Sequence, residues 1–242
     1  MKKVVNIFII FFFAILSING YALEIGPLVH EITTESKSNR TKITLRNNSS
    51  SYQLIDASVS RLVFEGADYD FNPATGNDLL VFPPAFKLEP GDSQSVMVIW
   101  GGAAQLSESL SYSIKFSAIN EIDPSKKGAI GIEIHYNVIV HVSSSLQAAD
   151  IAQVPIRGSK AADGLLFAVE NRGSKYSKLS NFDLLLKNSR TNQDHHIPSQ
   201  TVISEGFDIF IPANQTVDIT IPYSSLPTLD IDQIILVEKV YE

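Results

Sequence analysis

Apolar and polar residues alternate with a period of two along much of the chain. In an extended strand successive side chains lie on opposite faces, so this pattern predicts strands that are buried on one face only. Val, Ile, Thr, Phe and Tyr fill the alternating segments, as half-buried strands prefer. No segment keeps a sustained helical period. We predict strands over residues 42–45, 52–64, 95–100, 109–119, 130–142, 165–170, 179–187, 209–212, 216–221 and 234–241.

Turn-forming residues separate the predicted strands at short intervals. Many short strands joined in this way are typical of β-sandwiches. The clearest turns are Asn47-Asn48-Ser49, Pro90-Gly91-Asp92, Asn171-Arg172-Gly173 and Pro212-Ala213-Asn214.

An internal repeat indicates two similar domains. TLRNNSSSYQLIDASV from Thr44 and FAVENRGSKYSKLSNFDL from Phe167 both run strand, Asn-containing turn, Tyr, strand. The tyrosines of the two copies lie 124 residues apart, and two turn prolines lie 122 apart. Each half has about the size of an immunoglobulin-like sandwich. Small and polar residues over 143–164 favour a boundary there, so we predict domains at 23–145 and 146–242.

Residues 1–22 have the features of a secretory signal peptide. Lys2 and Lys3 precede an apolar run over 4–18, and Gly20-Tyr21-Ala22 places small residues at a cleavage site. The alternative is an uncleaved membrane anchor, but the run is shorter than the ~20 residues of a spanning helix. We therefore predict cleavage after Ala22 and an exported, soluble, periplasmic protein without stable membrane insertion.

Composition excludes several classes of function. Hydrophobic residues make up 44% and charged residues 19%, which suits a folded core rather than disorder. The chain has no cysteine, so it has no disulfide, thiol nucleophile or cysteine-based metal site. The formal net charge of −7 falls to −9 once Lys2 and Lys3 are removed. That acidity argues against a nucleic-acid partner.

No catalytic, metal or cofactor motif is evident. His195 and His196 are adjacent, but neighbours on a strand point to opposite faces, so we interpret them as part of a solvated loop. Asp68 and Asp70 could in principle be a glycosidase pair, but a solvated loop is the more ordinary interpretation. The sequence after Gly91 lacks the second glycine of a nucleophile elbow. We predict neither an enzyme nor a bound metal or cofactor.

The segment 130–142 is unusually long for a strand. Its thirteen residues would span about 40 Å at ~3.3 Å per residue, whereas a typical strand has 5–6 residues. Its first residues could extend beyond the core of the domain and pair with another chain. The alternative is a long last strand with a fully buried inner face. Every even position is apolar: Ile130, Ile132, Ile134, Tyr136, Val138, Val140 and Val142.

Four segments of the first half, in order, resemble the periplasmic pilus-assembly chaperones of the chaperone–usher pathway, the PapD-like family. They are TLRNNSSSYQLIDASV, LLVFPPAFKLEPGDSQSVMVIW (79–100), SESLSYSIKFSAI (107–119) and IGIEIHYNVIVHV (130–142). The second half resembles the family in LLFAVENRGSKYSKLSNFDLL. The short connection over 120–128 and the absence of cysteine fit the archaic branch.

The resemblance implies an all-β fold of two immunoglobulin-like sandwiches in a boomerang arrangement. It also implies that the protein captures pilus subunits by donor-strand complementation and delivers them to an outer-membrane usher. The long strand of the first domain would fill a groove in the subunit. Its donor residues would be Ile130, Ile132 and Ile134, with Tyr136 as a possible further contact.

One part of the family pattern is missing. Such chaperones usually hold the terminal carboxylate of the subunit with basic residues in the cleft between the domains. The matching positions here are Val98, Ser113 and Asn137. Lys115 and His135 are the candidate substitutes, and Lys115 is favoured because it stays charged at neutral pH. Either could equally be a solvated surface residue.

Two other classes remain possible from the sequence. A structural pilus subunit or secreted tandem adhesin would share the sandwich pattern, but a subunit should be one incomplete sandwich with an N-terminal extension. A carbohydrate-binding module usually presents exposed aromatic side chains, whereas the single tryptophan, Trp100, lies on a strand predicted to be buried.

Overall fold

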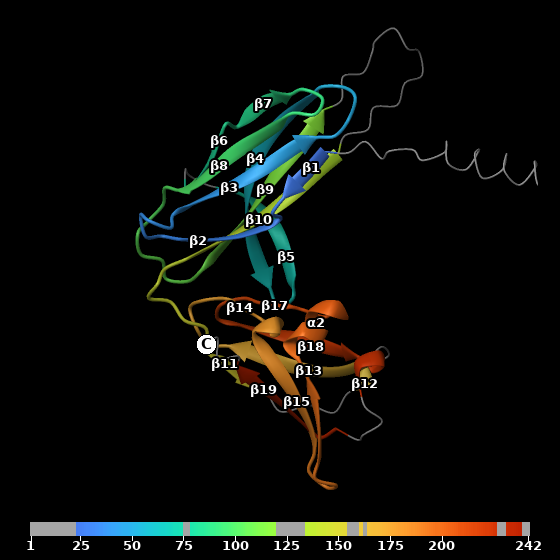
Figure 1. Cartoon of the computed structure of the whole chain (residues 1–242). Helices are drawn as coiled ribbons and strands as arrows, with labels where there is room; N and C mark the ends of the chain where they lie inside the picture. Colours follow the sequence, from blue (N-terminus) through green and yellow to red (C-terminus); the bar gives the residue numbers. More distant parts are fainter. Residues whose placement is uncertain are drawn as a thin grey trace, which may run out of the picture.

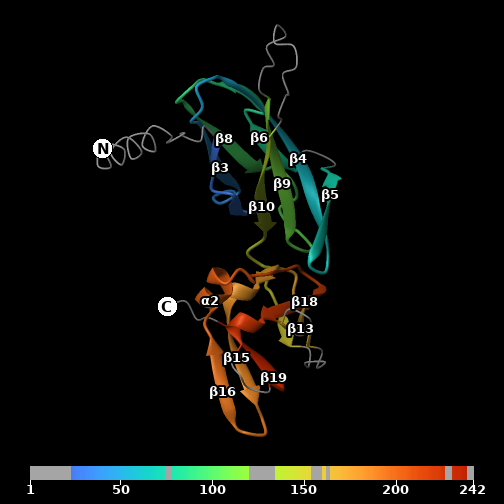
Figure 2. The same cartoon turned by 90° about the vertical axis from the view of Figure 1, so that its right-hand side faces the viewer.

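The computed structural model of this chain describes residues 23–74, 78–119, 134–153, 160–161, 164–226 and 231–238. Two β bodies lie end to end (Figures 1 and 2), and the segment 144–150 leads from one to the other. The predicted all-β fold of two sandwiches is confirmed. The predicted signal peptide and the donor candidates Ile130 and Ile132 lie outside the described residues.

The first body is built from two facing sheets. One has the order β1-β3-β8-β6, and the other has the order β2-β10-β9-β4-β5, with β7 also pairing with β4. The strands are β1 (Leu23–Gly26), β2 (Val29–Thr33), β3 (Arg40–Asn47), β4 (Gln53–Glu65), β5 (Asp68–Pro73), β6 (Leu79–Phe82), β7 (Ala85–Leu88), β8 (Ser93–Trp100), β9 (Leu110–Ile119) and β10 (Ile134–Ser143).

In its described residues the second body contains shorter strands, one six-residue α-helix and two 3-10 turns. β13 lies at its centre, paired with β11, β12 and β18, while β15 pairs with β16 and β19. The elements are β11 (Ile151–Gln153), β12 (Lys160–Ala161), β13 (Gly164–Asn171), β14 (Ser177–Lys178), η1 (Leu179–Asn181), β15 (Phe182–Asn188), β16 (Gln193–Ile197), α2 (Ser199–Ser204), β17 (Phe210–Ile211), β18 (Gln215–Pro222), η2 (Tyr223–Ser225) and β19 (Gln233–Glu238).

Each body has its own apolar core. In the first, Ile43 and Leu45 of one sheet pack with Phe116, Val138 and Val140 of the other, and all five are fully buried. The alternating apolar positions are therefore the inward faces of the strands, as the period of two predicts. Trp100 is buried as expected, and its indole N–H donates to the Ala103 carbonyl at 3.0 Å.

An equivalent asparagine ends a central strand in each body. Asn47 at the end of β3 and Asn171 at the end of β13 are both fully buried. Each side-chain oxygen accepts from the backbone N–H two residues later, and each side-chain nitrogen donates to the carbonyl four residues later. Each nitrogen also donates to a distant strand, to Leu88 at 3.0 Å and to Ile211 at 3.4 Å. The repeated Asn turn of the sequence is thus a repeated structural motif.

One predicted strand boundary is wrong, and one short helix was missed. The strand predicted over 179–187 begins at Phe182, since Leu179–Asn181 form a 3-10 turn. The helix α2 was not predicted. It has six residues and buries only Ser199 and Val202, too few for a helical period to be visible in the sequence.

Two segments interpreted as solvated loops are strands. His195 and His196 lie on β16, and Asp68 and Asp70 lie on β5. Both strands lie at a sheet edge and pair with one neighbour. Edge strands carry exposed polar side chains, so their composition is similar to that of a loop. His196 pairs with Asp183 of the neighbouring strand at 3.1 Å. Among the described residues no group of three or more metal-ligating side chains is found.

Candidate functional site

The first half of β10 has an open edge. β10 pairs with β9 along Ile134 to Val142, but it pairs with β2 only from Ile139 onward. The Ile139 N–H donates to the Leu28 carbonyl at 2.8 Å, where that second pairing begins. Within the described part of the chain, residues 134–138 therefore have no strand on the β2 side. An open edge of this kind can accept a strand from another chain.

The burial of β10 changes along its length. Val138, Val140 and Val142 are fully buried in the core of the first domain, Tyr136 is half-buried, and Ile134 is 45% exposed. These residues share one face, so that face leaves the core of its own domain as the strand runs back toward Ile134. The open edge and the exposed apolar side chain thus occur on the same stretch of β10.

The opposite face of β9 and β10 is polar. Three serines of β9 on this face are buried, and each bonds to a side chain of β10. The pairs are Ser111 with His141 at 2.8 Å, Ser113 donating to Asn137 at 3.4 Å, and Ser117 with His135 at 3.0 Å.

The candidate cations Lys115 and His135 lie on this polar face. Lys115 is exposed and lies opposite Asn137 on β10, close to the open edge. His135 is also exposed and bonds to Ser117. The predicted face of Lys115, shared with Ser113, is confirmed by the strand register. Val98 is fully buried in the core of the other sheet, so that position could not supply a cation to this face.

The polar face continues into a cleft between the two domains. A cavity of about 360 Å³ is lined from the first domain by side chains of β2, β4, β5 and β10, and from the second by Lys178, Asp208 and Phe210. Val29 and Ile139 form its wall next to the open edge of β10. A partner bound at that edge would therefore reach a cleft made by both domains.

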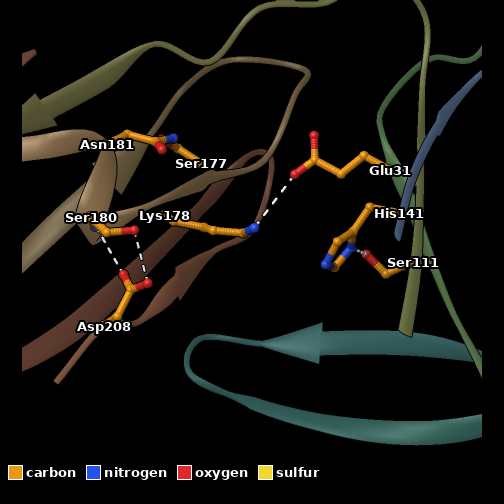
Figure 3. A network of polar contacts seen from close by, with 8 residues as sticks. All are labelled: Glu31, Ser111, His141, Ser177, Lys178, Ser180, Asn181 and Asp208. Carbon is orange, nitrogen blue, oxygen red and sulfur yellow. Dashed lines mark hydrogen bonds and ion pairs between the residues drawn. The ribbon is translucent and has the colours of Figure 1, made fainter. Parts of the chain in front are cut away.

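A polar network spans the cleft (Figure 3). Lys178 Nζ lies 3.4 Å from a carboxylate oxygen of Glu31, and the Tyr176 hydroxyl also bonds to Glu31. Burial alone would raise the pKa of Glu31, but the Tyr176 hydroxyl and Lys178 hold that pKa below its usual range. Burial and the nearby Glu31 carboxylate raise the pKa of Tyr176. On the far side of Lys178, Asp208 bonds to Ser180 at 2.8 Å.

His141 lies against aromatic rings of the second domain. Its ring stacks on Phe210 at 4.8 Å and lies 4.6 Å from Tyr176, while Ser111 bonds to its Nδ1. Burial, reinforced by the Lys178 charge and opposed by Glu31, lowers the pKa of His141 from 6.5 to about 4. The neutral imidazole is thus the form that fits this junction.

Acidification is expected to weaken the domain junction. Because the pKa of His141 is lowered in the folded protein, the unfolded chain binds the proton more strongly, and stability falls as pH drops from about 6.5 toward 4. Above pH 6.5 His141 is neutral in both the folded and the unfolded chain, so its full contribution to stability is present. Between pH 7 and pH 5 the expected loss is about 1–2 kcal/mol. Urea unfolding at both pH values measures this loss, and His141→Gln should remove most of the pH dependence. An equal pH dependence in that variant would contradict the assignment.

Comparison with known proteins identifies the first domain. Residues 28–145 match the family described as the pili and flagellar-assembly chaperone, PapD N-terminal domain. Over residues 28–145 the chain belongs to this family of pilus-assembly chaperones. No match was found among curated proteins. The structural or adhesin alternative is thereby replaced by a chaperone role in pilus assembly.

Solved structures share the fold of this chaperone over most of its length. The class 5 fimbriae chaperone CfaA is 14% identical, with 91% of this chain and 100% of that chain covered and a TM-score of 0.60. A chain of the CsuC–CsuE complex from the archaic Csu pili of Acinetobacter baumannii is 12% identical, with 91% and 100% covered and a TM-score of 0.52. A chain of the Salmonella enterica SafA–SafB complex is 14% identical, with 84% and 85% covered and a TM-score of 0.53.

The sequence did not reveal the contribution of the second domain to the cleft of this chaperone. Lys178, Asp208 and Phe210 lie far along the chain from β10, and no motif relates them to Glu31 or His141. Only the packing of the two domains brings these side chains together. The archaic assignment stays a prediction, because the class 5 and the archaic structures resemble this chaperone at similar identity.

In the part of the chain that the structure describes, no helix is long and apolar enough to cross a membrane.

Proposed function

We propose that this chaperone captures pilus subunits by pairing the open edge of β10 with a subunit strand. The observation that carries the proposal is that, among the described residues, the β10 edge at 134–138 has no strand on the β2 side, and that the exposed side chain of Ile134 lies on the same stretch. Backbone pairing would give affinity that is independent of sequence, and alternate side chains would enter pockets of the subunit. Ile130 and Ile132, which precede Ile134 on the same alternating pattern, would extend the donated row.

The energetics suit a protein that must also release its client. Burying one Ile side chain contributes ~1.5–3 kcal/mol, so three donor residues contribute roughly 5–9 kcal/mol before the cost of association. Tyr136 is already half-buried in its own domain and has less surface left to bury. Such binding needs no nucleotide or cofactor, and a later exchange of strands could drive release.

The proposed partners and compartment follow from the family and the sequence. The titles of two similar structures name complexes of a chaperone with a pilin or tip subunit. By analogy we propose a pilus subunit as the client of this chaperone and an outer-membrane usher as the acceptor.

Residues 1–22 would direct export to the periplasm and be removed after Ala22. Separate cores support domains at 23–145 and 146–242.

The test uses as its probe a pilin-like subunit from the genome that encodes this chaperone. The two proteins, co-expressed with their signal peptides, are expected to co-purify as a 1:1 complex. Failure to form that complex while both proteins fold would count against the proposal.

Lys115 is proposed to contribute electrostatic anchoring of the client. It is exposed beside the open edge, so Lys115→Ala is expected to weaken capture by about three- to tenfold without changing the unfolding temperature. His135→Ala serves as the comparison for the second candidate. Binding of the purified subunit, measured by calorimetry at low and high salt, checks this prediction. An unchanged affinity for Lys115→Ala would remove that residue from the anchoring role.

A further inference from the structure

The β4–β5 hairpin makes a two-point contact with the second domain. The Gly66 N–H at the hairpin tip donates to the side-chain oxygen of Gln215 at 2.8 Å. The side-chain nitrogen of Gln215 donates back to the Phe64 carbonyl, also at 2.8 Å. One glutamine thus satisfies a donor and an acceptor of the hairpin at once, which fixes both the position and the orientation of the tip.

Aromatic stacking reinforces the same contact. Phe64 of the hairpin stacks on Phe210 of the second domain, with ring centroids 4.7 Å apart. Phe210 in turn stacks with Tyr176 at 4.9 Å and with His141 at 4.8 Å. Phe210 therefore lies between two strands of the first domain, β4 and β10, and couples them to the second domain.

The local sequence allows the hairpin to reach this far. β4 has thirteen residues, and β5 pairs with its outer half from Ser60 to Glu65. Gly66 has φ +63°, a conformation that glycine adopts without strain, so the turn can present its backbone N–H to Gln215. This extension was not predicted, because Asp68 and Asp70 were interpreted as part of a solvated loop.

The hairpin lies away from the covalent connection between the domains. In Figures 1 and 2 the chain enters the second domain on one side of the junction, and the β4–β5 hairpin touches it on the other. A rotation of one domain about the connecting segment would open or close the cleft. That rotation must break the contacts of Gln215 and Phe210.

We propose that the β4–β5 hairpin is a strut that holds the cleft at the width needed for capture, with Gln215 and Phe210 as positioning residues. This inference rests on the proposed capture function. The cavity of about 360 Å³ has walls from both domains, so a client at the open edge of β10 meets the second domain only at one domain angle. Removing the contacts of Gln215 or Phe210 lowers the fraction of molecules with that domain angle. The apparent affinity for the client falls by the same factor.

The test measures the domain angle directly. The chain has no cysteine, so Thr44→Cys and Gln200→Cys, both exposed and one in each domain, can carry spin labels without background. Double electron–electron resonance should give a narrow distance distribution for the otherwise unchanged protein. Gln215→Ala and Phe210→Ala should broaden it. Gln215→Glu keeps the acceptor for Gly66 and loses the donor to Phe64, so its distribution should be intermediate.

Capture is measured on the same variants with the same pilin-like subunit as the probe. Gln215→Ala is expected to weaken binding about five- to tenfold. The control Gln94→Ala, whose side chain donates to the adjacent Ser95 carbonyl, should bind normally. A narrow distribution in both Gln215→Ala and Phe210→Ala would overturn the strut. A broadened distribution with unchanged capture would overturn its positioning role.

The reference variant Ile134→Asp separates this inference from the proposed function. If Ile134→Asp loses capture while Gln215→Ala binds normally, the strut proposal fails alone. If Ile134→Asp captures the subunit normally, the donor-strand function fails, and the positioning role fails with it.

Discussion

An aspartate in place of Ile134 is expected to leave this chaperone folded and to abolish capture of its subunit. The side chain of Ile134 is 45% exposed and contributes little to the core, so the domain should tolerate the change. In the complex the same side chain would enter an apolar groove, where an unpaired carboxylate costs several kcal/mol. We expect at least a hundredfold loss of affinity. Ile132→Asp should have the same effect.

A matched control is available on the second domain. Val237 is 47% exposed on β19, so Val237→Asp introduces the same charge at a similarly exposed strand position far from β10. Co-purification and calorimetry with the purified subunit compare the variants, and circular dichroism verifies their folding. Normal capture by Ile134→Asp would contradict the role of β10 as donor, whatever the control shows.

The second large effect concerns the repeated asparagine. Asn47→Ala removes the hydrogen bonds to Ser49, Ser51 and Leu88 and leaves a carbonyl of β7 buried without that donor. An unsatisfied buried polar group costs about 1–3 kcal/mol, so we expect a loss of about 3 kcal/mol in the free energy of unfolding of the first domain. Asn171→Ala should destabilise the second domain in the same way.

Urea unfolding measures these losses. The control is Asn48→Ala, whose exposed side chain donates to Glu24 and whose replacement should cost under about 0.5 kcal/mol. If the free energies of unfolding of Asn47→Ala and Asn171→Ala both lie within about 1 kcal/mol of that of the unchanged protein, the repeated motif does not stabilise the domains.

The all-β architecture could be predicted because each central strand has one buried face. Residues 138, 140 and 142 are apolar and fully buried, and the same alternation runs through β9. Edge strands were harder to predict, because β5 and β16 pair on one side only and keep polar side chains. The helix α2 and the turn η1 were missed since six and three residues cannot establish a period.

The donor edge could be suggested from sequence, but the cleft could not. Even positions of the segment 130–142 share one face whatever the fold, so Ile134 and Tyr136 were predictable candidates. The contacts of Glu31 with Lys178 and of Phe64 with Phe210 depend on how two domains pack, and they join residues about 150 positions apart. No local pattern encodes such a contact. Lys115 and His135 remain proposals.

Amide hydrogen exchange of β10, with and without bound subunit, tests the central claim most directly. Binding is predicted to protect the amides of residues 135 and 137, whose N–H groups point to the same side as that of Ile139, and alternate amides of the segment that precedes them, because a subunit strand would occupy the open edge. Two other edge strands of the first domain, β5 and β6, should exchange as in the free protein. Protection at β5 or β6 with no change at residues 134–138 would contradict donation of β10.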